Sequence, residues 1–210
     1  MGTFKNLVFD LGNVIIDIDY RVTVARFQQL ALVDFAQVVS YEAQHHIFDV
    51  FEKGGITAAQ FRHELRQFLK PGTTDEQINA AWNAILIDFP PHKFEILKGL
   101  KSRYKTFALS NINEIHVDSI NRVAQTKFGE KDFGSFFHAA YYSNEMGYRK
   151  PEARIYEMLL QKENLIPQET FFVDDKLENI EAAKAFGIQA YQLTNRDGFL
   201  SLLQQLQIVP

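Results

Sequence analysis

LVFDLGNVIIDID, residues 7–19, is the stretch of sequence that decides the fold. An apolar run that delivers one carboxylate, Asp10, into a Gly-Asn turn is typical of a buried parallel strand. In open α/β sheets, ligands bind at the carboxyl ends of such strands. Asp10 is therefore the first candidate for chemistry. From these residues alone, the alternative is that Asp10 only starts a turn, because Asp and Gly often do so together.

The rest of the chain alternates between strand and helix patterns after residue 88. Further strands are predicted at 106–110, 139–142, 170–173 and 188–193. Helices are predicted at 92–102, 114–125, 152–161 and 177–186, with a last one before Pro210. Strands that alternate with helices of this length favour βαβ units and a parallel sheet.

Residues 17–88 interrupt this alternation and are predicted to be all helical. Apolar residues recur at helical spacing over 20–35 and again near Phe51, and Gly54 follows in a turn. Two capping boxes, Thr57 with Gln60 and Thr74 with Gln77, begin further helices. The predicted fold is of the α/β class. A Rossmann-like parallel sheet with helices on both faces (residues 1–16 and 89–210) carries an inserted all-helical cap (residues 17–88).

Composition excludes several functions. The 210 residues are 46% apolar and 23% charged, which is typical of an ordinary globular protein. A net charge of −4 without a basic run argues against a nucleic-acid partner. No apolar run is long enough to span a bilayer, so we expect no membrane partner and a cytoplasmic location. The absence of cysteine excludes disulfides, thiolate metal sites and a cysteine nucleophile. The sequence does not indicate an oligomeric state.

Polar residues follow four of the predicted strands at their carboxyl ends. In chain order they are Asp10, Ser110-Asn111, Arg149-Lys150-Pro151 and Asp174-Asp175. One crevice at the sheet edge can collect all of them. Three carboxylates in one pocket repel one another unless a cation lies between them, and hard oxygen ligands suit Mg²⁺.

This set of groups fits phosphoryl transfer. Asp10 is predicted to be the nucleophile that forms an aspartyl-phosphate, and Asp174 and Asp175 are predicted to anchor Mg²⁺. Ser110 and Lys150 would bind phosphate oxygens. Each group also has a simpler interpretation: Ser110 as a turn residue, Lys150 as a solvated lysine, and Asp174 as a helix N-cap.

The motifs together resemble those of the haloacid dehalogenase-like hydrolases. The matching stretches are VFDLGNV at 8–14, LSN at 109–111, RKPE at 149–152, and FVDD at 172–175 with LEN at 177–179. The resemblance spans the chain in order, and LGNVI and RKPEARIY further resemble the branch that contains bacterial glucose-1-phosphate phosphatase. It implies a Mg²⁺-dependent phosphatase acting on a small phosphorylated metabolite, with a sugar phosphate favoured. It also implies a metal ligand in the Gly12 carbonyl, catalytic roles for Ser110 and Lys150, and substrate contacts from Asn111 and Arg149.

One position departs from the family pattern. Most phosphatases of the family have a second aspartate, the general acid and base, two residues after the nucleophile, where this chain has Gly12. Such assistance is worth roughly 10²–10⁴-fold in rate. Asp17 and Asp19 could replace it, although an acidic turn before the Tyr20 helix is the favoured interpretation. A phosphomutase, and a degenerate protein that binds a phosphometabolite without turnover, therefore stay as alternatives.

The cap is expected to select the substrate. The residues that could reach the pocket are His45, His46, Lys53 and the Gly54-Gly55 turn. Adjacent residues of a helix face different ways, so at most one of the two histidines would point inward. His63 and Trp82 are assigned to cap surface or packing. Arg149 is expected to contact the substrate or a cap carboxylate.

Overall fold

The structure is a computed structural model that describes residues 4–38 and 47–210, so the prediction for His45 and His46 lies outside the described residues. The core is a sheet of five parallel strands: β1 (Asn6–Phe9), β4 (Lys105–Ser110), β5 (Ala139–Tyr142), β6 (Thr170–Asp174) and β7 (Gln189–Gln192). They lie in the order β5-β4-β1-β6-β7, and β1 pairs with both β4 and β6. The prediction of a parallel sheet that contains β1 as a buried strand is confirmed.

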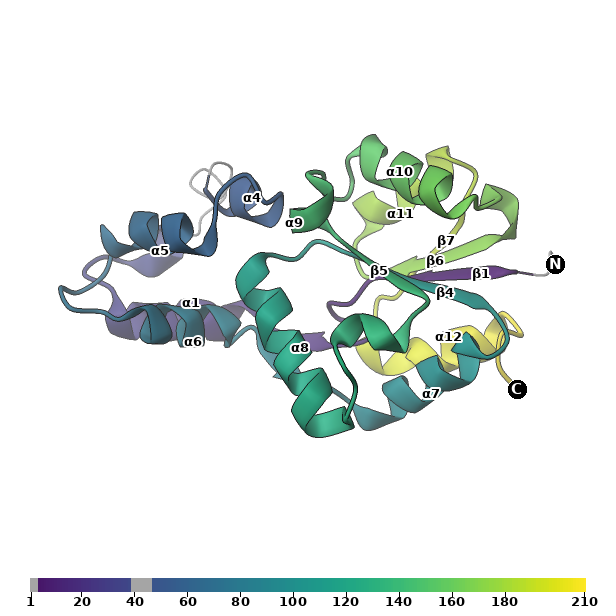
Figure 1. The fold of residues 1–210 in the computed structure, drawn as a ribbon, viewed down its shortest axis with the longest axis horizontal. Coiled ribbons are helices and arrows are strands. Elements are labelled where there is room, and N and C mark those ends of the chain that lie inside the picture. Colours follow the sequence, from purple (N-terminus) through teal and green to yellow (C-terminus); the bar gives the residue numbers. More distant parts are fainter. Residues whose placement is uncertain (1–3, 39–46) are drawn as a thin grey trace.

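Helices cover both faces of this sheet, as predicted (Figure 1). One face carries α7 (Pro91–Lys101), α8 (Glu114–Phe128) and α12 (Phe199–Gln205). The other carries α10 (Ala153–Glu163) and α11 (Leu177–Ala185). Side chains alternate across a strand, so Leu7 and Phe9 pack toward the first layer and Val8 toward the second. Because both faces are covered, every residue of β1 is buried, which explains its continuous apolar run.

Helices make up most of the inserted segment. They are α1 (Tyr20–Leu30), α2 (Phe35–Val38), α4 (Ile47–Glu52), α5 (Ala58–Arg66) and α6 (Asp75–Asn83). Both predicted capping boxes are present, with Thr57 and Thr74 each accepting a hydrogen bond from the backbone three residues on. These helices enclose an aromatic core of their own, in which Phe27, Phe61 and Trp82 are buried. The cap therefore has its own hydrophobic core.

The prediction that residues 17–88 are all helical is wrong at both ends. Asp17–Ile18 (β2) and Leu86–Asp88 (β3) form a two-stranded antiparallel sheet where the chain enters and leaves the cap. Pairing the two connections satisfies backbone groups that neither could satisfy alone. The helical pattern over 20–35 is also interrupted, since Ala31 is extended and separates α1 from α2.

The cap packs against the core chiefly through α8. Trp82 of α6 stacks on His116 at 5.2 Å between ring centroids, and its Nε1 donates to Asn113 Oδ1 at 3.2 Å. Ile115 of α8 belongs to the aromatic core of the cap. Lys53, on the opposite side, pairs with Glu152 of the core at 3.0 Å. These contacts hold the cap over the carboxyl ends of the strands.

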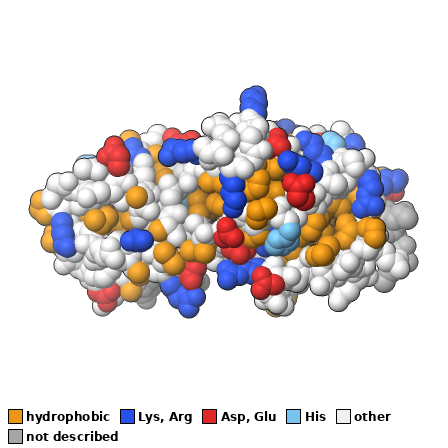
Figure 2. Space-filling model, turned by 90° about the horizontal axis from the view of Figure 1, so that it is seen from below, with side chains coloured by type: hydrophobic (Ala, Val, Ile, Leu, Met, Phe, Trp, Pro, Cys, Tyr) orange, Lys and Arg blue, Asp and Glu red, His pale blue; other side chains and the backbone are white. Residues whose placement is uncertain are grey.

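Two further short elements flank β5: the 3-10 helix η1 (Phe133–Phe136), which packs against α7 and α8, and α9 (Ser143–Met146), which packs against α4. Two more 3-10 turns, η2 (Pro167–Glu169) and η3 (Arg196–Gly198), lie before β6 and α12. On the face seen in Figure 2, acidic and basic side chains are interspersed among hydrophobic ones. No helix within the described ranges is long and apolar enough to cross a bilayer.

Candidate active site

Three carboxylates converge at the carboxyl ends of β1 and β6. These neighbouring strands pair Phe9 with Val173, so the residues that follow, Asp10 and Asp174, emerge side by side. Asp175 completes the group, and the three side chains have oxygen atoms within 4.8 Å of one another. Asp10 is 8% exposed and Asp174 is fully buried. The structure thus brings together the three carboxylates that the sequence predicted.

Lys150 lies between two of these carboxylates. Its Nζ is 2.7 Å from Asp10 Oδ1 and 2.6 Å from Asp174 Oδ2, and the residue is only 1% exposed. It reaches the site from the loop between α9 and α10. Burial alone would lower the pKa of Lys150, but the two carboxylates outweigh it and raise that pKa above its ordinary value. The interpretation of Lys150 as a solvated lysine is excluded.

The carboxylates of Asp174 and Asp175 accept hydrogen bonds from different groups of the protein. Asp174 Oδ1 accepts from the Lys176 backbone and from Asn179 Nδ2, both at 2.9 Å, so this carboxylate is bonded at both oxygens. Asp175 Oδ2 accepts from Asn13 Nδ2 at 3.1 Å. Asn13 adopts a left-handed conformation with φ of 56°, which asparagine tolerates better than most residues. The Gly-Asn turn therefore orients one carboxylate as well as reversing the chain.

The site carries more negative charge than Lys150 can balance. Burial raises the pKa of Asp10 to about 7, and the charges of Asp174 and Asp175 add to this although Lys150 opposes it. Burial likewise raises the pKa of Asp175. A hard divalent cation binds clustered carboxylate oxygens whose negative charge is not balanced by nearby cations. The residues present therefore fit a Mg²⁺ ion.

Ser110 and Asn111 follow β4 on the other side of Asp10. Ser110 is the last residue of the strand and is 4% exposed. The Asn111 side chain accepts from the Lys150 backbone N–H and donates to the Lys150 carbonyl, both at 2.8 Å. Asn111 was expected among the substrate contacts, and both ends of its amide bond the backbone of Lys150.

The space beside Gly12 is filled by an apolar side chain. A Cβ atom at residue 12 would lie 3.9 Å from Asp10 Oδ2 but only 2.7 Å from Ile18 Cδ1. The neighbouring acids do not replace the missing group. Asp17 pairs with the buried Lys93 at 3.2 Å. Asp19 caps α1, and its hydrogen bonds with Arg21 lower its pKa to about 2, so it is ionised and has no proton to donate at neutral pH.

A cavity of about 390 Å³ lies between the cap and the core. Its lining residues are Tyr20, Thr23, Val24, Phe48, Asp49, Glu52, Trp82, Arg149 and Lys176. Arg149 spans the two parts, because its guanidinium pairs with Asp49 and, at 3.2 Å, with Glu52 of α4. Arg149 therefore contacts cap carboxylates, which was one of its two expected roles.

The other cap predictions have mixed outcomes. Trp82 is buried and packs as expected, but it also lines the cavity. His63 is exposed on α5. Lys53 and Gly54 contact the core instead of lining the cavity, since Lys53 pairs with Glu152 and Gly54 lies directly against the Asn144 backbone.

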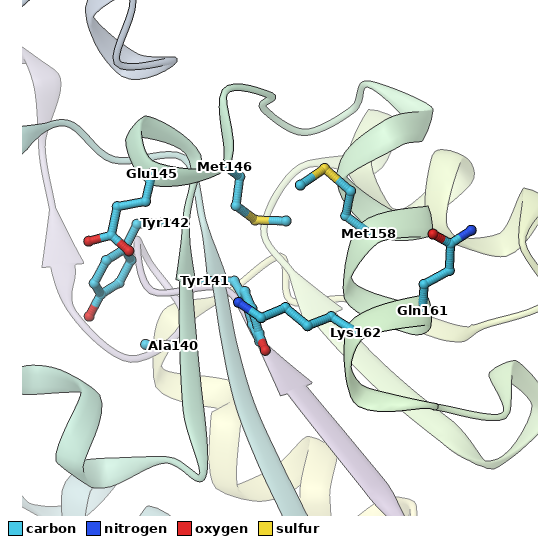
Figure 3. A pocket seen from close by; sticks show the side chains of 8 residues that line it. All are labelled: Ala140, Tyr141, Tyr142, Glu145, Met146, Met158, Gln161 and Lys162. Atoms are coloured by element: carbon cyan, nitrogen blue, oxygen red, sulfur yellow. The ribbon is translucent and has the colours of Figure 1, made fainter.

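Two further cavities flank the site. One, of about 650 Å³, is bordered by Asn13, Asp175 and Arg196, and Tyr20 separates it from the cavity under the cap by lining both. The other, of about 540 Å³, lies at the edge strand β5 and is lined by Tyr141, Met146 and Met158, among others (Figure 3). None of the predicted site residues lines that second one.

Comparison with known proteins identifies the class. Residues 4–187 match the haloacid dehalogenase-like hydrolase family, so the chain belongs to that family. A D-ribitol-5-phosphate phosphatase of Bacteroides thetaiotaomicron is 31% identical over 191 residues, covering 91% of this chain and 92% of its own. A sesquiterpene phosphatase of Aspergillus oryzae is 27% identical and covers 97% of both chains.

Solved structures agree with this assignment. A wild-type family enzyme of Bacteroides thetaiotaomicron, in complex with magnesium and inorganic phosphate, has a TM-score of 0.80 at 34% identity and covers 90% of this chain and 93% of its own. A predicted hydrolase of the family from Porphyromonas gingivalis has a TM-score of 0.90 at 26% identity and covers both chains completely. The fold and family expected from the motifs are confirmed.

Some residues of the site were not predicted from the sequence. Asn13 and Asn179 stand inside the recognised motifs, so a search for partners of the acidic pair could have found them. Tyr20 and Glu52 lie in the cap segment, and their place beside the site depends on how the cap packs. No local sequence signal marks that packing.

Proposed function

We propose that this protein is a Mg²⁺-dependent phosphatase that hydrolyses a small phosphorylated metabolite through an aspartyl-phosphate at Asp10. The observation that carries the proposal is the group of three carboxylates with oxygens within 4.8 Å, among which the buried Lys150 contacts Asp10 and Asp174. A binding protein for a neutral ligand would gain nothing from such concentrated charge. A phosphate ester and a divalent cation together would balance it.

Each residue has a distinct proposed role. Asp10 is the nucleophile, and its lone pair attacks phosphorus as the bond to the leaving oxygen breaks. Lys150 holds the Asp10 carboxylate in place and offers its remaining N–H to a phosphate oxygen. Ser110 offers its hydroxyl from the end of β4. Asn111 positions Lys150 through its backbone, and Arg149 links the site to the cap.

The proposed metal ligands are Asp10, the Gly12 carbonyl, Asp174 and Asp175. Because both oxygens of Asp174 are already bonded within the protein, Asp175 is the better candidate for direct contact and Asp174 for contact through water. When bound, Mg²⁺ would neutralise phosphate charge and keep Asp10 ionised.

We propose residues 1–16 and 89–210 as the core domain and residues 17–88 as a cap domain that selects the substrate. A cavity of about 390 Å³ suits a small metabolite. The carboxylate of Asp49 can accept hydrogen bonds from hydroxyl groups. This lining favours a sugar phosphate or polyol phosphate over a long apolar chain, in agreement with the ribitol-phosphate activity of the bacterial relative.

Phosphate release from a panel of sugar and polyol phosphates tests the proposal. We expect release by the metal-stripped protein to appear on addition of Mg²⁺, and Asp10→Asn to reduce it by about 10³-fold or more. Far-UV circular dichroism should show the variant folded. Binding of these phosphates without turnover above the Asp10→Asn level would contradict an enzyme and favour a degenerate binding protein.

A further inference from the structure

The proposed reaction leaves one proton unassigned. When an alkyl or sugar phosphate transfers its phosphoryl group, the departing oxygen needs a proton, and the position where the family places its acid is Gly12 with Ile18 packed against it. Asp17 is paired with Lys93, and Asp19 is held ionised by Arg21. The donor must therefore come from another element that faces the same site.

Glu52, at the carboxyl end of α4, is such a group. It lines the cavity between cap and core, and its side chain is only 18% exposed. Its Oε2 has no hydrogen-bond donor among the described residues, although Arg149 lies 3.2 Å away. The Glu52 backbone carbonyl accepts a hydrogen bond from Ser143 Oγ at 2.6 Å, which fixes this end of α4 to the core. The backbone of Glu52 is thus held by the core, and its Oε2 has an ion pair with Arg149 but no hydrogen bond within the described residues.

Electrostatic contacts connect Glu52 to the reaction centre. The charge of Lys150, whose Nζ bonds Asp10, acts on the Glu52 carboxyl. Tyr20 lines the cavity under the cap together with Glu52, and it also lines the cavity bordered by Asp175. The two cavities that share Tyr20 therefore place Glu52 and the acidic cluster in the same region of the molecule.

The surroundings of Glu52 also suit a proton donor. The charged groups that act on it are Arg149, Lys176, Asp49 and Lys150. Burial raises the pKa of Glu52 above its ordinary value in spite of the three cations. A general acid works best when its pKa approaches the working pH, which makes Glu52 better suited than Asp19.

We propose that Glu52 is the general acid and base that replaces the aspartate missing at residue 12. This inference rests on the proposed phosphatase function. In the first step Asp10 attacks phosphorus, the bond from phosphorus to the leaving oxygen breaks, and that oxygen takes the proton of the Glu52 carboxyl. In the second step water attacks the aspartyl-phosphate and gives a proton to the Glu52 carboxylate. The bond from phosphorus to Asp10 breaks, which restores both side chains and releases phosphate.

Two aryl phosphates of nearly equal shape test the first step. 4-Nitrophenolate leaves readily without a proton, whereas the phenolate of phenyl phosphate leaves poorly without one. We expect Glu52→Gln to lower kcat/KM for phenyl phosphate by about tenfold or more beyond its effect on 4-nitrophenyl phosphate. Since kcat/KM reports the steps through phosphoryl transfer, slow hydrolysis of the intermediate would not mask the difference.

Asp49→Asn is the matched control, because Asp49 pairs with the same Arg149 and lines the same cavity. We expect this variant to lower kcat/KM for both esters by the same factor. An equal fall for both esters in Glu52→Gln would overturn the inference and leave the phosphatase intact. No phosphate release by wild type from either ester or from the sugar and polyol phosphate panel would instead overturn the proposed function and this inference with it.

A second test uses only the wild type, so its result does not depend on whether Glu52→Gln folds correctly. Across a series of substituted phenyl phosphates, an enzyme with a proton donor should show only a shallow dependence of kcat/KM on the acidity of the leaving phenol. A steep dependence in the wild type would also overturn the role of Glu52.

Discussion

Lys150 neutralises only part of the negative charge gathered around Asp10. It contacts Asp10 and Asp174, whereas Asp175 is bonded by the neutral amide of Asn13. Burial raises the pKa of Asp10, the proposed nucleophile, to about 7 although Lys150 opposes this, and the charges of Asp174 and Asp175 add to it. A cation at Asp175 would lower that pKa. At the scale of single residues, we therefore expect metal binding to favour the ionised form of the proposed nucleophile.

His116 is a buried titratable residue outside the candidate active site, and its protonation can be tested through the pH dependence of stability. Its Nε2 lies 3.1 Å from the Trp82 carbonyl and its Nδ1 lies 3.0 Å from Asn113 Nδ2, which fits a neutral ring with the proton on Nε2. Burial lowers the pKa of His116 from 6.5 to about 4. The unfolded chain therefore binds more protons than the folded one between these pH values, and stability must fall as the pH falls through that window.

We expect His116→Gln to remove this part of the pH dependence, because glutamine can still donate to the Trp82 carbonyl but does not titrate. The wild type should lose up to about 3 kcal/mol more than the variant between pH 6.5 and pH 4. Urea unfolding, followed through the fluorescence of the single tryptophan, measures the difference. Parallel curves of unfolding free energy against pH for the wild type and His116→Gln would contradict a neutral, buried His116.

The grouping of most side chains of the candidate site could be predicted from the sequence, because each follows a strand in a fixed order. The parallel sheet then brings Asp10, Ser110 and Asp174 to one edge. The actual use of Asn111 could not be predicted, since its two bonds to Lys150 depend on how two loops meet. Arg149 and Glu52 illustrate the same limit, because their contact joins segments about a hundred residues apart.

At the scale of helices and strands, capping motifs in the sequence predicted where helices begin. The capping boxes at Thr57 and Thr74 begin helices in the structure, and the helix predicted at 177–186 is present as α11, after which Gly187 has φ of 80°. The strands β2 and β3 were missed, because two or three residues are too few to show an alternating pattern. Their pairing is decided by the insertion of the cap as a whole.

Alanine substitutions at Gly54 and Gly72 distinguish local backbone strain from loss of the contact between cap and core, because both glycines have a positive φ. Gly54 has φ of +68° and Gly72 has φ of +83°, so alanine is strained at either position. No heavy atom lies within 4 Å of a Cβ at Gly72, but a Cβ at Gly54 would collide with the Asn144 carbonyl oxygen of the core. We expect Gly72→Ala to cost about 1 to 2 kcal/mol and Gly54→Ala to cost more.

The two variants should also differ in activity. Gly54 follows the end of α4, so displacing it moves Asp49 and Glu52 away from Arg149. We expect kcat/KM to fall in Gly54→Ala and to stay near wild type in Gly72→Ala. Steady-state phosphate release gives kcat/KM and urea unfolding gives the stability of each variant. Equal kcat/KM and equal stability in the two variants would contradict packing of the Gly54 turn against the core.

At the scale of the whole molecule, cap and core form one structure around the site. The core supplies the carboxylates and Lys150, and the cap supplies Tyr20 and the carboxylates of α4. The chain termini lie at the far end of the core from the cap (Figure 1). The proposed division into core and insertion rests on the change of strand and helix pattern near residue 88. A contact of Arg149 with a cap carboxylate was one expected possibility, but its pairing with Asp49 and Glu52 in particular depends on how the two parts pack.

Covalent trapping of Asp10 tests the central claim most directly. Wild-type protein turning over a phosphate ester with Mg²⁺ would be quenched and reduced with borohydride, which converts an aspartyl-phosphate to homoserine. Mass spectrometry of the peptide containing residues 4–21 should then find the reduced product at Asp10 and nowhere else, and Asp10→Asn should yield none. Reduction at another carboxylate, or none during steady phosphate release, would contradict Asp10 as the nucleophile.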